Sequence, residues 1–101
     1  AGAKMQYCPQ LCGHVPFRDN TMRTSNPDIW VAGDASGIEE ASAAMVEGRI
    51  AGHSAAKALG CKVNEASFKE YWTRLDHLRA GEVGEKIRGG ICQVLVDGWE
   101  A

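Results

Sequence analysis

An acidic side chain stands where a short apolar run gives way to a loop of small residues. The apolar run covers residues 29–32, and Gly33 and Asp34 follow it directly. Unbroken apolarity over a few residues is typical of a strand that is buried on both faces, as in a parallel sheet. Ligands bind such sheets at the carboxyl ends of the strands. A carboxylate at this position would accept hydrogen bonds from the hydroxyl groups of a ligand.

The residues that follow predict a helix N-terminus close to this carboxylate. We expect a long helix from about residue 38 to residue 59, ended by Gly60. The N–H groups and positive dipole end of a helix N-terminus suit anions and developing negative charge. Strand, loop and helix start together predict a pocket for a polyhydroxylated, anionic ligand. A Gly-Asp pair after a strand is also common in plain turns, and spacing alone leaves that alternative open.

One face of the expected helix carries mostly very small residues. Two glycines in a helix interior each cost about 1 kcal/mol relative to alanine, so we expect a close approach of the backbone to a sheet or a ligand. The residues on the face are Ala41, Ala44, Met45, Gly48, Ala51, Gly52, Ala55 and Leu59. The neighbouring Glu47 and Arg49 are expected to be structural or solvated.

The remaining segments predict a small mixed fold. We expect irregular structure over residues 1–13 and a short edge hairpin over residues 14–25, with a turn at 18–20. Asn64 should cap a second helix that covers residues 65–80. The fold class is therefore α/β, or α+β for the chain as an isolated fragment.

The second helix has an apolar stripe, and the region after it has no clear pattern. We expect the stripe to be core packing, with a subunit interface as the alternative; it consists of Phe68, Tyr71, Trp72, Leu75 and Leu78. Gly81 should stop this helix. Residues 82–101 stay ambiguous, because Gly89, Gly90 and Gly98 interrupt an apolar pattern.

Composition narrows the class of protein. The 101 residues suffice for one domain, and a net charge of −2 with scattered basic residues argues against a nucleic-acid surface. No apolar run approaches the roughly 20 residues that span a bilayer, and no signal pattern opens the chain. We therefore expect a cytoplasmic protein with neither a nucleic-acid nor a membrane partner.

The cysteines offer a further alternative, a metal site. Cys8, Cys12 and His14 place three potential ligands within seven residues. Structural zinc sites use four ligands, and the chain has no second close pair. We expect reduced thiols that are partly buried as small apolar side chains, and we assign none of Cys8, Cys12, Cys61 and Cys92 a role.

A resemblance to a flavoprotein family adds to this interpretation. Residues 14–60 resemble the second FAD-binding segment of the pyridine nucleotide-disulfide oxidoreductase-like superfamily. That segment has a Thr-Ser-x-Pro-x-Ile strand, then Ala-x-Gly-Asp, then a helix with Ala-x-x-Glu-Gly-x-x-Ala, matched here by residues 24–34 and 44–51. Residues 15–16, 23–25 and 37–41 are similar to a narrower group. This group contains the FAD-bearing subunits of four kinds of enzyme: sarcosine oxidase (its alpha subunit), L-proline dehydrogenase, opine oxidase and hydrogen cyanide synthase.

The resemblance implies a set of cofactor-binding residues. Asp34 would bind the ribityl hydroxyls of FAD, and Gly33 would let the backbone approach the cofactor. Backbone N–H groups of Gly37, Ile38 and Glu39 would face the pyrimidine edge of the flavin. The helix dipole would stabilise the negative charge that grows there on reduction.

The resemblance also implies that the chain is incomplete as an enzyme. It has no GxGxxG turn and no Cys-x-x-Cys pair. Residues 1–60 would form the C-terminal part of a discontinuous FAD-binding domain, and residues 61–101 a helical extension. The parent would be an FAD-dependent dehydrogenase, with NAD(P), if used, bound by segments absent here. We expect this chain alone to be inactive. Its expected partners are the remainder of the FAD-binding domain and the other subunits of a hetero- or homo-oligomer.

Overall fold

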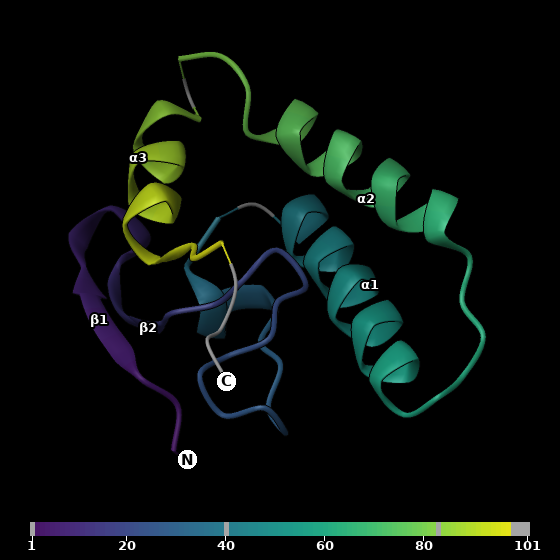
Figure 1. Ribbon diagram of the computed structural model, residues 1–101. Coiled ribbons are helices and arrows are strands. Elements are labelled where there is room, and N and C mark those ends of the chain that lie inside the picture. The colour runs from purple at the N-terminus through teal and green to yellow at the C-terminus, as the bar shows by residue number, and fades with distance from the viewer. Residues whose placement is uncertain (1, 40, 83, 98–101) are drawn as a thin grey trace.

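The computed structural model describes residues 2–39, 41–82 and 84–97, and within them one helix packs on a small hairpin while two longer helices pack on each other (Figure 1). Helices α1 (Ala41–Ala58) and α2 (Glu65–Leu78) lie side by side, while α3 (Glu85–Val94) covers the hairpin. A mixed α and β fold is therefore confirmed. In chain order the elements are β1 (Met5–Cys8), the 3-10 turn η1 (Pro9–Leu11), β2 (Gly13–Pro16), the 3-10 turn η2 (Gly33–Ser36), α1 (Ala41–Ala58), α2 (Glu65–Leu78) and α3 (Glu85–Val94).

The hairpin lies earlier in the chain than the sequence predicts. Strands β1 and β2 pair antiparallel, with Met5 opposite Pro16 and Cys8 opposite Gly13. The expectation of irregular structure over residues 1–13 and a hairpin over 14–25 is therefore wrong. The turn is made by η1 and by Cys12, whose left-handed φ of 67° closes it. At the expected turn the chain does reverse, but only an isolated bridge between Arg18 and Thr24 forms there.

The apolar run at residues 29–32 is not a strand. It makes one antiparallel bridge, between Trp30 and Arg23, and its residues are half-buried. The predicted strand buried on both faces is therefore wrong for this chain. A buried parallel strand needs a neighbour on each side, and the described residues supply none.

The two long helices share one apolar cluster. Val46 and Ile50 of α1 pack against Leu75 of α2, and the predicted apolar stripe of α2 lies around them. The Asn64 side chain accepts a hydrogen bond from the N–H of Ala66 at 3.0 Å, so the predicted cap of α2 is confirmed. The interpretation of the stripe as core packing is confirmed as well.

The small-residue face of α1 is not the face that is buried. Met45 is 64% exposed, and added Cβ atoms at Gly48 and Gly52 would meet nothing within 4 Å. The expected packing of that face against a sheet is wrong within this chain. Val46 and Ile50 remove more apolar area from water than alanine or glycine, so they turn toward α2 instead.

Residues 85–94 form a helix despite their glycines. Ile91 and Val94 of α3 close a second apolar cluster with Leu11 and Val15 of the hairpin. Gly90 allows this contact, because a Cβ there would lie 2.7 Å from Leu11 Cγ. The sequence left this region ambiguous, and the structure shows a helix there because tertiary packing outweighs the low helix propensity of Gly89 and Gly90. Residues 98–101, with Gly98, lie outside the described part of the chain.

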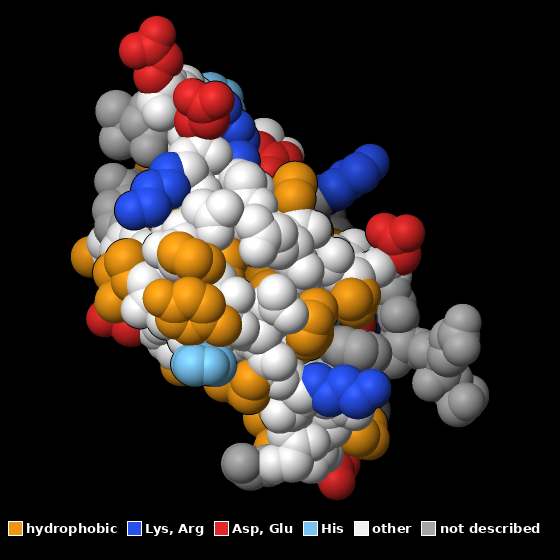
Figure 2. Space-filling view, turned by 90° about the vertical axis from the view of Figure 1, so that its left-hand side faces the viewer, with side chains coloured by type: hydrophobic (Ala, Val, Ile, Leu, Met, Phe, Trp, Pro, Cys, Tyr) orange, Lys and Arg blue, Asp and Glu red, His pale blue; other side chains and the backbone are white. Residues whose placement is uncertain are grey.

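The surface combines exposed apolar side chains with charged ones. Figure 2 faces the side of the molecule that carries β1 and α3, and hydrophobic side chains reach the surface there in patches. Met5 and Tyr7 of β1 are 51% and 58% exposed. Of the described helices, none combines the length and the apolarity that crossing a membrane requires.

The two adjacent glycines of α3 give a matched stability test. Gly90→Ala should destabilise by about 1–2 kcal/mol, because the new methyl group overlaps Leu11 in a packed core. In Gly89→Ala the new methyl group points into open space, so the higher helix propensity of alanine should stabilise the folded state by about 0.5–1 kcal/mol. Urea unfolding of both variants measures the difference. Equal effects of the two substitutions would show that α3 does not pack on η1 as described.

Candidate functional site

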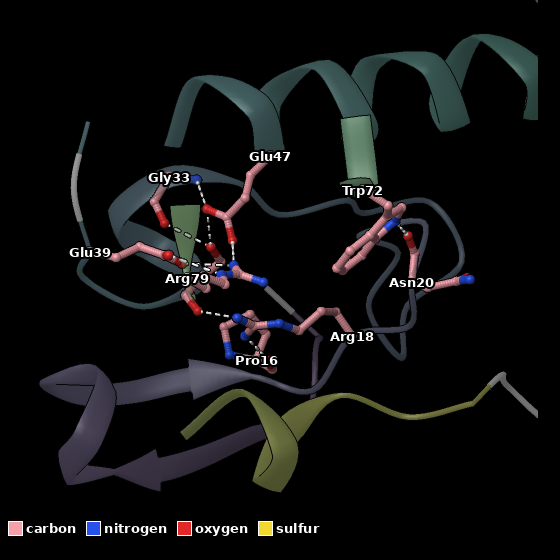
Figure 3. Close-up of polar contacts among 9 residues, drawn as sticks. Pro16, Arg18, Asn20, Gly33, Glu39, Glu47, Trp72 and Arg79 are labelled. Carbon is pink, nitrogen blue, oxygen red and sulfur yellow. Dashed lines mark hydrogen bonds and ion pairs between the residues drawn. The ribbon is translucent and has the colours of Figure 1, made fainter. Parts of the chain in front are cut away.

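Four buried charged side chains meet beneath the loop that joins residue 33 to α1 (Figure 3). Glu47 of α1 is fully buried, and Arg79 at the C-terminal end of α2 is 5% exposed. Glu39 of the loop and Arg18 beyond β2 complete the set, and we call these four residues the charged network. Because isolated buried charges are very unfavourable, each member must find partners here.

Glu47 fastens the beginning of the loop. Its Oε1 accepts hydrogen bonds from the backbone N–H of Gly33 at 3.2 Å and from Ser36 Oγ at 3.0 Å. Its Oε2 lies 3.0 Å from Arg79 Nη2. One carboxylate therefore joins η2, α1 and α2.

Arg79 fastens the end of the loop. Its guanidinium binds Glu39 through two bonds, Nε to Oε1 at 3.0 Å and Nη2 to Oε2 at 2.7 Å. This paired geometry is the stronger form of an arginine–carboxylate contact. The backbone carbonyl of Arg79 also accepts a bond from Arg88 of α3 at 2.6 Å, so all three helices are connected at this residue.

Arg18 joins the loop to the hairpin. Its guanidinium donates to the carbonyls of Ser36 and Pro16, the latter at 3.0 Å. Its backbone pairs with α3, because the N–H of Arg18 donates to Val94 O and its carbonyl accepts from Val96. The charged network thus lies between the two apolar clusters.

Burial changes the pKa values of two members. Loss of solvation, and then the nearby Glu39 carboxylate, raise the pKa of Glu47 above its usual value near 4.5, although Arg79 and the Ser36 hydroxyl oppose the shift. Loss of solvation lowers the pKa of Arg18 below its usual value, with the Glu47 carboxylate opposing the shift.

The five sequence-predicted residues share one loop but differ in their surroundings. Gly33 and Asp34 lie in η2, and the Asp34 side chain is exposed. Gly37 adopts a φ of 129°, and a Cβ there would lie 3.0 Å from Leu11, so glycine is required. Glu39 turns inward to Arg79. The Asp34 carboxylate is therefore the acidic group of the loop that faces solvent.

Two of the three expected amide donors of this loop, the N–H groups of Gly37 and Ile38, are already engaged. The N–H of Gly33 donates to Glu47, that of Gly37 to Asp34 O at 3.1 Å, and that of Ile38 to Leu11 O at 3.2 Å. In addition, α1 begins at Ala41, three residues later than predicted, and Glu40 lies outside the described residues. These backbone groups of the loop therefore find their partners within the chain.

Neither Arg18 nor Arg79 was predicted as a site residue from the sequence, and Glu47 was expected only to be structural or solvated. One signal was present. Glu47 shares a helix face with Ala43 and Ile50, four residues before it and three after, so it is an acid on an otherwise apolar face. Arg79 gave no such signal, because its partners lie 32 and 40 residues away.

The cysteines do not form a ligand cluster. Buried Cys8 has its Sγ 3.7 Å from the carbonyl of Gly90, while Cys12 is exposed and His14 lies beside the Tyr7 ring. No group of three His, Cys, Asp or Glu side chains within the described residues could hold a metal ion. The arrangement does not support a metal site at Cys8, Cys12 and His14.

Comparison with known proteins shows similarity to the subunits of one kind of oxidase. The chain is 43% identical over 60 residues to an opine oxidase subunit of Rhizobium meliloti, which is 59% of this chain and 11% of that protein. It is 33% identical over 82 residues to the protein of the same name from strain 1021, covering 78% of this chain and 18% of the relative. The corresponding opine oxidase subunit of Agrobacterium tumefaciens (strain Ach5) is 41% identical over 51 residues, which is 50% of this chain and 10% of the relative.

These matches define the extent of the similarity. The chain spans between about a tenth and a fifth of the length of these relatives. No protein-family model matches it, and no solved structure shows significant similarity.

Removing the shared cation should cost much of the stability. Arg79→Met leaves the Glu39 and Glu47 carboxylates buried near each other without their partner, and we expect a loss of about 3 kcal/mol. The control is Lys57→Met, which breaks an ion pair whose side chains are 60% exposed, and it should change the stability little because solvent screens such a pair. Urea unfolding measures both, and similar losses would contradict the central place of Arg79.

The raised pKa of Glu47 predicts a pH dependence of stability. Since its pKa is higher folded than unfolded, the folded state binds more protons, and its contribution is complete below about pH 4.5. That contribution is lost as pH rises from there through the raised value, at a slope of up to about 1.4 kcal/mol per pH unit. Glu47→Gln should remove this slope, whereas Glu70→Gln on exposed α2 surface should not. Unfolding free energies measured from pH 4.5 to 8 test this; an unchanged slope in Glu47→Gln would assign it to another group.

Proposed function

We propose that this chain is a segment of an FAD-dependent oxidoreductase and supplies the loop of residues 33–39 that contacts the cofactor. The similarity to opine oxidase subunits supports the oxidoreductase class, because three relatives of that name match the chain. The Gly-Asp loop and the helix after it support the position of the segment within such a protein.

One observation carries the proposal: a rigidly fastened loop presents the Asp34 carboxylate to solvent. Glu47, Arg18 and Arg79 hold the inner side of the loop, and no bond among the described residues engages the Asp34 side chain. A preorganised carboxylate is suited to accept hydrogen bonds from the ribityl hydroxyls of a flavin nucleotide. When bound, FAD would supply the two-electron chemistry of the parent protein.

Existing hydrogen bonds of the loop limit the contacts with FAD that we propose. Gly37 and Ile38 already use their N–H groups within the chain, and the Glu39 carboxylate binds Arg79. The proposed contact with the sugar chain therefore rests on Asp34, with Gly33 beside it leaving room. Contacts of residues 37–39 with the flavin ring require the loop to exchange its own bonds when the remaining FAD-binding segments pack against it.

The proposed partner is the remainder of a discontinuous FAD-binding domain. The small-residue face of α1 is exposed around Met45, Gly48 and Gly52, and nothing in the described chain covers it. A face of alanine and glycine allows a sheet to approach closely. The segments that would bind the pyrophosphate of FAD, and NAD(P) if it is used, belong to that remainder. Cytoplasmic location and further oligomer subunits stay part of the proposal.

The alternative function, an assembly module that acts through the α2 stripe, has less support. Phe68, Trp72 and Leu75 pack against α1 within the chain, so the stripe does not offer a free surface.

A chimera tests the proposal. We would replace the matching stretch of the Rhizobium meliloti opine oxidase subunit with this sequence and measure FAD retained after gel filtration. Asp34→Ala should weaken FAD binding about tenfold, since a hydrogen bond to a charged group is worth about 1.5–3 kcal/mol. Asp28→Ala removes an exposed carboxylate six residues earlier and should have no effect.

The same experiment defines failure. A folded chimera that retains FAD equally with Asp34→Ala and without it would refute the role of Asp34. The 101-residue chain alone should not quench flavin fluorescence in a saturable manner, and stoichiometric FAD binding by it would refute the claim that one segment is insufficient.

A further inference from the structure

A separate cavity lies at the other end of α1 from the charged network. It encloses about 270 Å³ between residues 21–30, the C-terminal half of α1 and the first turn of α2. Its lining includes two aromatic side chains, Trp30 and Phe68, and none of the residues of the loop at 33–39. The cavity is large enough for a molecule the size of a single substituted ring.

Positive charge predominates around this cavity. The charged side chains Arg23 and Lys57 line it, against one acid, Glu65. Glu65 is already paired with Lys57, with Nζ and Oε1 2.8 Å apart. The Arg23 guanidinium lies 4.8 Å from the centre of the Trp30 ring, which keeps its charge at the aromatic wall. An anionic group in the cavity would therefore meet favourable potential.

The aromatic wall also carries an unsatisfied donor. The indole N–H of Trp30 is buried and has no hydrogen-bond partner among the described residues. The contrast with Trp72 is direct, because the indole N–H of Trp72 donates to Asn20 O at 2.7 Å (Figure 3). An indole nitrogen is a donor only, so its missing partner must be an acceptor. Buried polar groups normally have partners, and an exception calls for an explanation.

The walls favour a flat apolar body next to that acceptor. The rings of His53 and Phe68 lie 5.5 Å apart at an interplanar angle of 30°, and Trp30 lines the same cavity. A planar ring would bury its faces against such surfaces. An ion such as acetate would leave most of this apolar surface wet.

We propose that this cavity binds a small organic carboxylate with a planar apolar body. The carboxylate accepts the Trp30 indole N–H and is attracted by Arg23 and Lys57, while the ring lies among the aromatic side chains. The site is independent of the proposed flavin segment, since its residues contact neither the loop at 33–39 nor the charged network in any described bond.

Titration of the 101-residue chain with benzoate tests the proposal. In ¹⁵N-labelled protein, the indole N–H signal of Trp30, identified by its absence in Trp30→Phe, should move in a saturable manner as the hydrogen bond forms. Benzyl alcohol has the same ring without the charge, and acetate has the charge without the ring. Each should bind at least about tenfold more weakly than benzoate, because it lacks one of the two recognised parts.

Variants separate the cavity from general charge attraction. Trp30→Phe keeps an aromatic wall but removes the donor, and it should weaken benzoate binding about tenfold. Lys57→Gln should weaken it by a factor of about two to five, as expected of a partly exposed charge. The matched control is Lys69→Gln on α2, which removes the same charge away from the cavity and should leave the affinity unchanged. Circular dichroism verifies that each variant keeps its helices.

Several results would overturn the proposal. One is a Trp30 indole signal that does not move. Another is a pair of benzoate and acetate shifts that are equal in size and never saturate. A further one is an equal loss of benzoate affinity in Lys57→Gln and Lys69→Gln. The last two would indicate only weak anion attraction to the surface.

Discussion

The buried ion pair of Glu47 and Arg79 is the interaction on which the arrangement of this chain depends. It lies between two apolar clusters, one formed by α1 and α2 and the other by the hairpin and α3. Burying two charges is favourable only when their remaining bonding groups are satisfied. Glu39, Ser36 and the N–H of Gly33 provide that satisfaction, so the pair also determines the path of the loop above it.

The network makes the two halves of the chain dependent on each other. A boundary near residue 60 follows from the resemblance, yet Arg79 comes from the second half and its partners Glu39 and Glu47 from the first. The helix that carries Arg79 is held against α1 by apolar contacts, which bring the guanidinium to the loop. Helix α2, through Arg79 at its C-terminal end, thus helps to hold the loop in place.

Helix α1 serves a different purpose at each end. Its first half carries Glu47 and fastens the loop that presents Asp34, while its second half lines the cavity with His53 and Lys57. Between them, the part of the small-residue face around Gly48 and Gly52 is covered by nothing in the described chain. Such a face has little apolar area to gain from burial by side chains, but it permits close approach of a flat partner, which is consistent with a missing sheet.

Local signals in the sequence determined the two long helices, the Asn64 cap and the shared position of residues 33–39, because periodicity and capping act over a few residues. Tertiary structure alone decided that residues 29–32 form no strand, that Val46 and Ile50 face the core, and that residues 85–94 are helical. A strand exists only with a neighbour, and a helix buries whichever face its partner contacts. The pairing of Arg79 with carboxylates 32 and 40 residues earlier likewise leaves no local trace, because folding alone brings those positions together.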